Sequence, residues 1–429
     1  MKKDIWKRLI TDSQEKDLSH VIRRNLVIPL ELDKVISLIG VRRSGKTYLL
    51  YSLIQQLRKK TDPTSIVFIN LEDDRLFPLQ LTDMNELVES YYELFPHQRN
   101  STVHFLFDEI QNVPEWEKFI RRLHDTEKCR IFITGSSARF LSKEIATSMR
   151  GRTISFEVFP LSFEEYLQFR DIPIQIHSSR TVARIRNALT EYITKGGFPE
   201  TVGLNDDLSQ KILHEYLGLI IYHDVIERYN VANTFLLKFL VKYCFANIST
   251  LLSFNKLYND FRSQGLQLSK NTLYEYVSYL EDAYAVFSIP VYASSVREGM
   301  RNPKKIYSID HAFKRIVDIP FSPDLGRIYE NIVFLELRRK GKELFYIKGK
   351  QEVDFLFMED GTPHLINVCY DIEHPETKER EINGLIEAVK RLKVSEAVLI
   401  TAEKEETIKV GNKIVQIVPL WKWLLVDKF

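Results

Sequence analysis

The 429-residue chain is 44% hydrophobic, carries a formal net charge of +2 and contains three cysteines. This length predicts two to four domains, and the apolar content is enough for ordinary folded cores. The near-neutral charge argues against a protein that binds polyanions over its whole surface, so a nucleic-acid contact would need a local patch.

The sequence also indicates where the protein works. Its first eight residues lack the apolar core of a signal peptide, and no charge-free stretch is long enough to span a bilayer. Cys129, Cys244 and Cys369 have neither zinc spacing nor the pattern of a disulfide framework, which is typical of buried thiols in a reducing compartment. We therefore expect a cytoplasmic protein with no membrane partner.

Residues 40–47, after a lead-in at 1–30, read Gly-Val-Arg-Arg-Ser-Gly-Lys-Thr, the G-x-x-x-x-G-K-T pattern of a phosphate-binding loop. An apolar run at 35–39 predicts a buried strand before the loop, and residues 48–54 are compatible with a helix after it. This order directs backbone N–H groups and the positive end of a helix at a polyphosphate. A Gly-Lys turn without a ligand is the alternative.

The loop residues have distinct expected roles. The Lys46 ammonium would reach the β- and γ-phosphates of a nucleoside triphosphate, and the Thr47 hydroxyl would bind Mg²⁺. The residues expected to hold the nucleotide are Gly40, Arg43, Ser44, Gly45, Lys46, Thr47 and Tyr48.

A second acidic motif supports this interpretation. After an expected strand at 65–71, residues 103–109 form an apolar run that ends in Asp108 and Glu109. A strand buried between helices meets water only at its carboxyl edge, where ligands bind in open α/β sheets. We expect Asp108 to hold Mg²⁺, usually through water, and Glu109 to orient the attacking water.

Two more strands and a helical stretch follow. An apolar run at 130–133 leads into Thr134, and a strand-like segment at 153–158 follows Arg152. Residues 161–245 place apolar side chains at helical spacing, interrupted by a Gly-Gly-Phe-Pro segment that could be a hinge.

Residues 246–295 suggest a winged helix-turn-helix. One helix is expected over 251–262 and a second over 270–283, capped by Ser269. In a DNA reader the second helix enters the major groove, where acidic side chains are unfavourable. Here it carries Lys270 and Asn271, but also Glu275, Glu281 and Asp282.

The later basic residues could instead grip a DNA backbone from the wing. These residues are Arg297, Arg301, Lys304 and Lys305. A protein–protein module with a solvated basic loop explains the same pattern.

Six motifs occur in a fixed order. They are Gly-Val-Arg-Arg-Ser-Gly-Lys-Thr (40–47), Phe-Asp-Glu-Ile-Gln (107–111), Ile-Thr-Gly-Ser-Ser (133–137), Arg-Gly-Arg (150–152), Phe-Pro-Leu-Ser-Phe-Glu-Glu-Tyr (159–166) and Gly-Gly-Phe-Pro-Glu (196–200). Through this set the chain resembles the prokaryotic AAA+-superfamily ATPases with a C-terminal domain of unknown function. The resemblance spans nearly the whole chain and implies ATP-dependent switching or motor activity.

The resemblance also implies an organisation and further site residues. Thr134 would sense the γ-phosphate, and Arg152 or Arg150 would be the finger that reaches a neighbour's nucleotide in a homo-oligomer. An ordinary strand end and a solvated arginine are the alternatives. The implied parts are a lead-in (1–30), a P-loop ATPase core (31–160), a helical lid (161–245), a winged helix (246–295) and a nuclease-like domain (296–429).

The last part resembles the PD-(D/E)xK nuclease core, an α/β restriction-endonuclease-like fold. Glu330 and Asp354 match its acidic residues, but Asn367 and Cys369 stand where Glu and Lys should be. An amide binds Mg²⁺ more weakly than a carboxylate, and a thiol cannot replace an ammonium. A lysine that migrated to Lys378 would restore only the cation. We therefore expect no nuclease activity and a role in binding or assembly.

Together these observations predict an α/β protein with a P-loop AAA+ parallel-sheet core that binds and hydrolyses ATP with Mg²⁺. The leading hypothesis is a DNA-associated ATPase. The alternative is a nucleotide-gated regulatory or signalling protein that acts on a protein partner. An ATP-dependent nuclease is the third hypothesis, disfavoured by Asn367 and Cys369.

Overall fold

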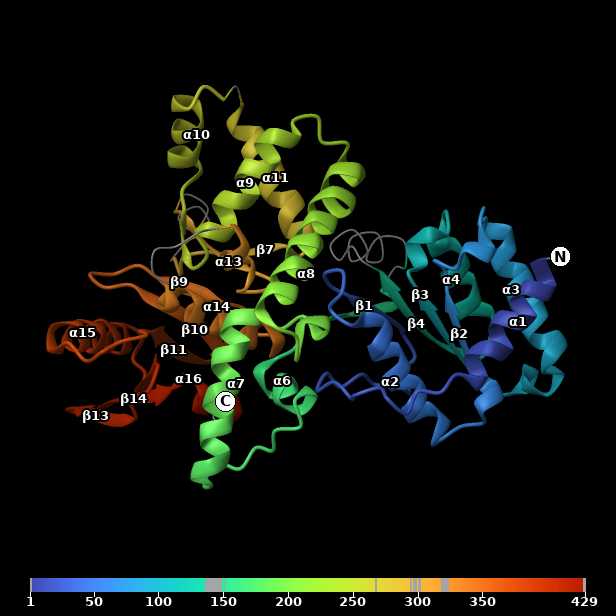
Figure 1. The fold of residues 1–429 in the computed structure, drawn as a ribbon, viewed down its shortest axis with the longest axis horizontal. Helices are drawn as coiled ribbons and strands as arrows, with labels where there is room; N and C mark the ends of the chain where they lie inside the picture. The colour runs from blue at the N-terminus through green and yellow to red at the C-terminus, as the bar shows by residue number, and fades with distance from the viewer. Residues whose placement is uncertain are drawn as a thin grey trace. The chain divides into compact units, whose positions relative to one another are not determined.

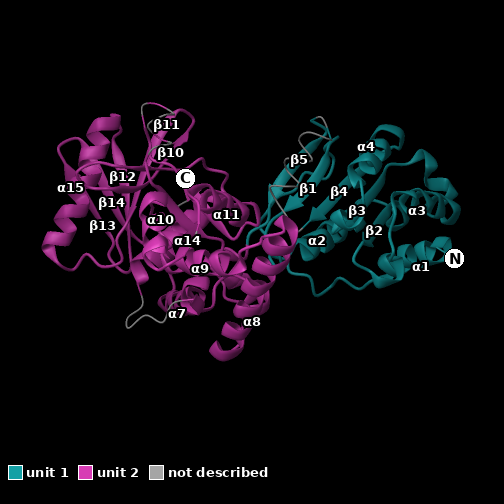
Figure 2. Cartoon of the chain, turned by 90° about the horizontal axis from the view of Figure 1, so that it is seen from above, with its two compact units in different colours: residues 1–159 teal, residues 160–429 magenta. Residues whose placement is uncertain are grey.

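The computed structural model describes residues 2–135, 149, 151–266, 268–293, 295, 299, 302–317 and 324–426. The chain divides into two compact units, residues 1–159 and residues 160–429 (Figure 2). Figure 1 labels their helices and strands. None of the helices in the described part of the chain combines the length and apolarity needed to span a bilayer.

Unit 1 is built on a five-stranded sheet with the order β2-β3-β4-β1-β5, and every neighbouring pair is parallel. The strands are β1 (Val35–Ile39), β2 (Ile66–Asn70), β3 (Val103–Asp108), β4 (Cys129–Gly135) and β5 (Thr153–Glu157). Because β1, β3 and β4 run the same way, their carboxyl ends meet at one edge, where the sequence places the phosphate loop, Asp108 and Thr134. The predicted α/β core is confirmed.

Helices connect these parallel strands. The α-helices of unit 1 are α1 (Lys2–Glu15), α2 (Lys46–Arg58), α3 (Leu81–Leu94) and α4 (Trp116–Thr126). Short 3₁₀ turns are η1 (Pro63–Ser65), η2 (Asp74–Leu76), η3 (Pro96–Asn100) and η4 (Ile110–Asn112).

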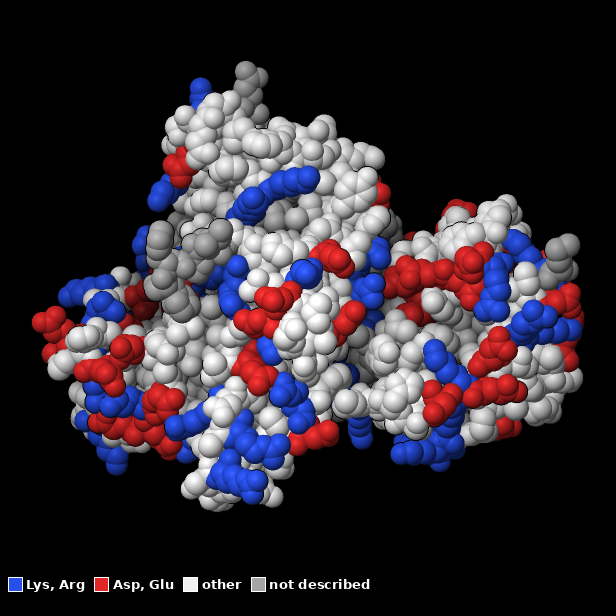
Figure 3. Space-filling view, in the orientation of Figure 1, with Lys and Arg blue, Asp and Glu red and all other residues white. Residues whose placement is uncertain are grey.

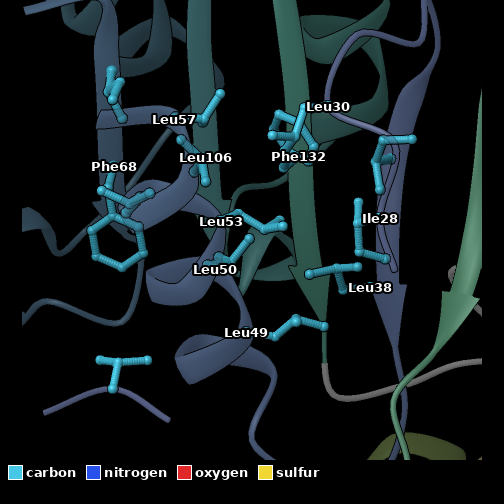
Figure 4. Packing of buried hydrophobic residues seen from close by; sticks show 14 of the residues in the cluster. Ile28, Leu30, Leu38, Leu49, Leu50, Leu53, Leu57, Phe68, Leu106 and Phe132 are labelled. Carbon is cyan, nitrogen blue, oxygen red and sulfur yellow. The ribbon is translucent and has the colours of Figure 1, made fainter. Parts of the chain in front are cut away.

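The core under the phosphate loop is formed by α2 and one face of the sheet (Figure 4). Apolar side chains from α2 pack against residues from four strands, and Ile28 and Leu30 of the lead-in join the same cluster. The labelled members of α2 and the strands are Leu38, Leu49, Leu50, Leu53, Leu57, Phe68, Leu106 and Phe132. The second part of the lead-in is therefore built into the ATPase core.

Unit 2 begins with a helical region. Its elements are α6 (Phe163–Phe169), α7 (Ser179–Lys195), η5 (Pro199–Thr201), α8 (Asp206–Leu219), the π-helical η6 (Ile220–Glu227) and α9 (Thr234–Ala246).

The two glycines after α7 form a tightly packed junction. Gly196 has φ 77° and ψ −170°, and a Cβ built there would lie 2.2 Å from Asp310 Oδ1. The Gly197 N–H donates to Asp310 Oδ2 at 2.7 Å. A junction clamped by a carboxylate from a distant segment is not the hinge that the sequence suggests.

A small three-stranded antiparallel sheet with the order β6-β8-β7 follows. Its region contains β6 (Thr250–Leu252), α10 (Phe254–Ser263), α11 (Lys270–Asp282), β7 (Val286–Ile289) and β8 (Lys304–Ser308). Residues 250–252 pair with β8, so the helix expected to start at Leu251 starts at Phe254, after its cap Ser253. Ser269 caps α11 by accepting from the Thr272 N–H. Strand β8 lies beyond the boundary expected at 295.

The rest of unit 2 is a six-stranded mixed sheet with the order β13-β14-β12-β11-β10-β9. Its strands are β9 (Phe345–Ile347), β10 (Val353–Glu359), β11 (Thr362–Val368), β12 (Glu396–Thr401), β13 (Glu406–Val410) and β14 (Lys413–Pro419). Its helices are α13 (Phe313–Val317), α14 (Leu325–Arg339), α15 (Pro375–Leu392) and α16 (Leu420–Leu425).

Candidate functional site

The phosphate loop has a backbone that requires glycine at two positions. Gly40 has φ 152°, and a Cβ built on it would lie 2.2 Å from the Val158 carbonyl oxygen. Gly45 has φ 97° and caps the N-terminus of α2. Arg43 also has a positive φ, of 65°. The two glycines of the motif thus make the tight turn that presents the start of α2 to a ligand.

The loop lysine and threonine start α2 and face different partners. The Lys46 side chain is buried, and its ammonium donates to the carbonyl oxygens of Gly40 and Val41 at 3.1 and 3.0 Å. The Thr47 hydroxyl donates to Asp108 Oδ2 at 2.7 Å. The loop and the acidic end of β3 therefore meet through a direct side-chain contact.

Thr134 joins the two acidic residues. Because β3 and β4 are in register at Phe107 and Ile133, the next residues, Asp108 and Thr134, lie side by side. The Thr134 hydroxyl donates to Asp108 Oδ1 and accepts from the Glu109 N–H at 2.9 Å. Thr47 and Thr134 thus hold Asp108 from both sides.

The pKa of Asp108 is raised above its ordinary value, mainly because the side chain is buried. Burial raises the pKa of Asp108, the hydroxyls of Thr134 and Thr47 lower it, and the Glu109 charge raises it again. Glu109 has a left-handed backbone, with φ 54°, and accepts from the Gln111 side-chain amide. The acidic pair is therefore a place where a bound cation would relieve unfavourable charge.

Glu72, after β2, belongs to the same electrostatic environment. Partial burial of the Glu72 side chain, followed by the Glu109 charge, raises the pKa of Glu72, although the side chain keeps contact with solvent. Arg42 and Arg43 of the phosphate loop oppose this shift.

The remaining predicted loop residues lie around this centre. Ser44 is buried, whereas Tyr48 is 54% exposed, and its ring meets those of His20 and Tyr51 edge-on at centroid distances of 6.5 and 5.7 Å. Tyr48 therefore lies outside the group formed by Thr47, Asp108, Glu109 and Thr134.

Arg152 lies at the amino-terminal ends of the strands, opposite the ends that carry the phosphate loop and Asp108. Its carbonyl oxygen accepts from the Val35 N–H, at the start of β1, at 2.8 Å. Its guanidinium pairs with Asp125 at 2.9 and 3.2 Å. Arg152 cannot reach the phosphate loop of its own chain from there, and Arg150 lies outside the described residues.

Arg24 is a site-supporting residue that the sequence did not single out. Its buried guanidinium donates to the Ser44 carbonyl in the phosphate loop and to the Phe159 carbonyl, at 2.9 Å each. Phe159 is the last residue of unit 1. The only signal in the sequence is a pair of arginines, Arg23 and Arg24, ahead of the first strand.

We expect Arg24→Lys to raise the KM for ATP roughly tenfold, because an ammonium lacks the planar fork that reaches both carbonyls. The neighbouring Arg23 is exposed, so Arg23→Lys is the matched control and should leave KM unchanged. Steady-state phosphate release measures both. Equal KM values for ATP in the two variants would show that Arg24 does not support the phosphate loop.

A pH effect follows from the buried aspartate. Only the ionised Asp108 carboxylate can hold Mg²⁺, and its raised pKa means that ionisation is lost at a higher pH than for an ordinary aspartate. We expect Mg²⁺-dependent ATP binding to weaken early on acidification. Thr134→Val removes a hydroxyl that lowers this pKa, so it should move the loss to still higher pH. Calorimetric titrations with and without Mg²⁺ across a pH series test this; identical pH profiles for both proteins would contradict it.

The family model described as "AAA domain" matches residues 32–167, the part of the chain that contains this parallel sheet and the phosphate loop. A second model, "Domain of unknown function (DUF8612)", matches residues 186–317.

The chain also has full-length relatives. "Uncharacterized protein MJ1544" of Methanocaldococcus jannaschii is 38% identical over 438 aligned residues, which cover 99% of this chain and 96% of the relative. The chain therefore belongs to the same family as this archaeal protein. An "Uncharacterized protein" of Haemophilus influenzae is 29% identical over 395 residues, covering 91% of this chain and 94% of that one.

Among solved structures, the Walker-type ATPase PABY2304 of Pyrococcus abyssi covers 74% of this chain and 95% of its own length. The identity is 13% and the TM-score is 0.45, a likeness too loose to carry an argument.

Proposed function

We propose that this protein binds ATP with Mg²⁺ at the phosphate loop and hydrolyses it as an AAA+ switch or motor. The observation that carries the proposal is the contact of Thr47 and Thr134 with the two oxygens of Asp108. These contacts join the loop, β3 and β4 at the single edge where a triphosphate would lie.

The donor set at this edge suits magnesium. Thr47 and Asp108 offer two oxygen ligands in direct contact, and Mg²⁺ prefers a few protein oxygens together with water and substrate phosphates. When bound, a magnesium ion held by Thr47 and Asp108 would supply positive charge that offsets the negative charge developing on the phosphates.

The chain's own residues then have separate tasks. Lys46 would exchange its carbonyl partners for phosphate oxygens, and the start of α2 would direct N–H groups at them. Glu109 would orient the attacking water and accept its proton. Thr134 would hold both acids in place as well as face the γ-phosphate.

Phosphate release from ATP tests the proposal. The wild-type protein should release phosphate in Mg²⁺ and stop in excess EDTA. Thr47→Ala removes a proposed metal ligand and should lower turnover, whereas Thr126→Ala, on the surface of α4, should not. Turnover that EDTA leaves unchanged would argue against the proposed metal site.

We propose that Arg152 acts only between subunits. Its guanidinium pairs with Asp125 and not with its own phosphate loop, so a nucleotide that it contacts would belong to a neighbouring subunit. Turnover per subunit should therefore rise with protein concentration in the wild type and be low and flat in Arg152→Ala. Concentration-independent turnover in the wild type would count against the finger role.

We propose DNA as the leading partner, through a winged helix. The order α9-β6-α10-α11-β7-β8 with a β6-β8-β7 sheet is the arrangement that such modules use, and α11 would enter the major groove. Exposed residues of α11 include Lys270, Asn271, Tyr274 and Glu275. Its other acidic residues are engaged internally, because Glu281 accepts from Ser288 and Asp282 accepts from Tyr229.

Only part of the expected basic wing supports this partner. Lys304 is exposed, whereas Lys305 is buried and faces carboxylates, so the expectation that Lys305 contacts DNA is wrong. The physical reason is strand alternation, which sends adjacent residues of β8 to opposite faces. Arg297 and Arg301 lie outside the described residues.

DNA binding has a direct test. Lys270→Glu should weaken duplex binding and flatten its salt dependence, whereas Lys211→Glu, an equal charge change on α8, should do neither. Fluorescence anisotropy over a salt series measures both. No binding by the wild type would favour the second candidate.

The second candidate is a nucleotide-gated regulator that acts on a protein partner. On the face drawn in Figure 3, the surface over α9–α11 is mostly uncharged, with a few basic side chains and fewer acidic ones. Phe235 of α9 and Tyr274 of α11 are 65% and 52% exposed, as aromatic anchors of a protein interface would be. ATPase activity that does not respond to any nucleic acid would favour this candidate.

We also propose that the last domain is nuclease-like but inactive. The order α14-β9-β10-β11-α15-β12 supports the likeness. Asn367 bridges the backbone N–H of Asp354 and the Glu381 carboxylate, and burial raises the pKa of Cys369 to about 11, so it stays a thiol. Lys378 pairs with Glu406 at 2.5 Å and does not join Glu330 or Asp354.

A further inference from the structure

An ionic cluster lies in unit 2 around the buried Lys305, and its only exposed member is Glu352. Lys305 of β8 is 3% exposed, and its ammonium contacts three carboxylates. The distances from Nζ are 2.6 Å to Glu352 Oε1, 2.7 Å to Asp354 Oδ1 and 3.0 Å to Glu330 Oε1. These carboxylates come from α14, from β10 and from the turn before β10.

The polar atoms of this cluster are largely paired with each other. The Lys305 ammonium donates hydrogen bonds to Glu330 Oε1 and Asp354 Oδ1 and forms an ion pair with Glu352. Asp354 Oδ2 accepts from the Val368 N–H at 2.8 Å, and Glu330 Oε1 also accepts from the Tyr307 hydroxyl at 2.7 Å. Asp354 thus has both oxygens engaged, and Glu330 shares one oxygen between two donors.

The pKa shift of Lys305 is consistent with a charged ammonium at this position. Burial alone lowers the pKa of Lys305, but the charges of Asp354, Glu330 and Glu352 outweigh it and raise the pKa, so the lysine stays charged. Burial and the Asp354 charge raise the pKa of Glu330 to about 8. The Lys305 charge and the Tyr307 hydroxyl oppose this rise in the pKa of Glu330.

We propose that Lys305 is the resident cation of this acidic site, where its ammonium takes the position that a divalent metal would occupy. Glu330 and Asp354 are the two residues that match the acidic pair of a nuclease core, so Lys305 of β8 lies between the two acidic residues that the resemblance indicates. The inference rests on the contacts of Lys305 and is independent of the proposed ATPase activity.

The consequence is a latent metal site. Removing the ammonium while keeping the side-chain volume would leave three converging carboxylates, which are oxygen ligands that Mn²⁺ and lanthanide ions prefer. Tyr307 lies against Glu330, so a bound Tb³⁺ would be close to an aromatic ring that can sensitise its luminescence.

The test uses the full-length protein and Tb³⁺ luminescence excited through tyrosine. The signal of this site is defined as the part that Asp354→Asn abolishes, which separates it from Tb³⁺ bound near the phosphate loop. Asp360→Asn, an exposed carboxylate in the β10–β11 turn, is the matched control. The wild type should show no such signal, whereas Lys305→Met should show a saturable one that Mn²⁺ displaces.

Two results would overturn the inference. One is a Tb³⁺ or Mn²⁺ signal in the wild type that Asp354→Asn abolishes, or Mn²⁺-dependent DNA cleavage with the same dependence. The other is a folded Lys305→Met protein without the signal. If Lys305→Met does not fold, Lys305→Gln takes its place, and a folded Lys305→Gln protein without the signal would overturn the inference in the same way.

Discussion

Glu109→Gln is expected to lower the turnover of ATP by about 10²–10⁴-fold, the usual contribution of a general base. The amide keeps the size of the side chain and removes the proton acceptor. The backbone N–H of residue 109 would still donate to Thr134, so Asp108 should keep its position and ATP should still bind. Single-turnover phosphate release and calorimetric ATP titration measure the two effects separately.

Glu117→Gln in the first turn of α4 is the matched control for this prediction, because it makes the same chemical change in the same unit at a residue with no proposed role in the site. It should keep wild-type turnover. Loss of ATP binding in Glu109→Gln, or turnover within a few-fold of the wild type, would show that Glu109 does not have the proposed role.

Gly196→Ala is expected to destabilise unit 2 strongly. The backbone at φ 77° and ψ −170° lies in a region that only glycine occupies readily, which costs on the order of 1–3 kcal/mol for alanine. The added methyl group would also lie 2.2 Å from Asp310 Oδ1, and overpacking of this kind costs about 1–3 kcal/mol more. Thermal melting should show a drop of roughly 2–4 °C per kcal/mol for a domain of this size.

The control is Gly218→Ala in the last turn of α8, where the chain continues into η6 and no neighbouring atom lies within 4 Å of the added Cβ. Alanine favours a helix by about 0.5–1 kcal/mol over glycine, so this variant should melt at or above the wild-type temperature. Equal melting temperatures for the two variants would mean that the junction with Asp310 is flexible.

The ATPase core follows closely from the sequence because its signals are local. Each signal is one contiguous segment whose residue types match its chemical role. These segments are the phosphate loop, the apolar strand before it and the acidic end of β3. Parallel pairing then brings strand ends together at one edge, so the meeting of Thr47, Asp108 and Thr134 could be anticipated from strand direction.

Other features depend on contacts that no local pattern encodes. Lys304 and Lys305 look alike in the sequence, and only the pairing of β8 decides that one is exposed and the other lies among Glu330, Glu352 and Asp354. The role of Arg24 depends on the carbonyl of Phe159, which is 135 residues away.

The glycine pair after α7 shows the same limit. Gly-Gly indicates conformational freedom in the sequence, but Asp310, more than one hundred residues later, clamps it. A hinge and a packed junction differ only in this long-range partner.

The most direct measurement of the central claim is a calorimetric titration of the Glu109→Gln protein with ATP, in Mg²⁺ and in EDTA. We expect saturable binding of one ATP per chain, with a higher affinity in Mg²⁺ than in EDTA. The Mg²⁺ effect should disappear in an Asp108→Asn background, and binding should be lost with Lys46→Ala. No heat of binding in Mg²⁺, or binding that Lys46→Ala leaves intact, would contradict the claim that this loop and the acidic end of β3 form one nucleotide site.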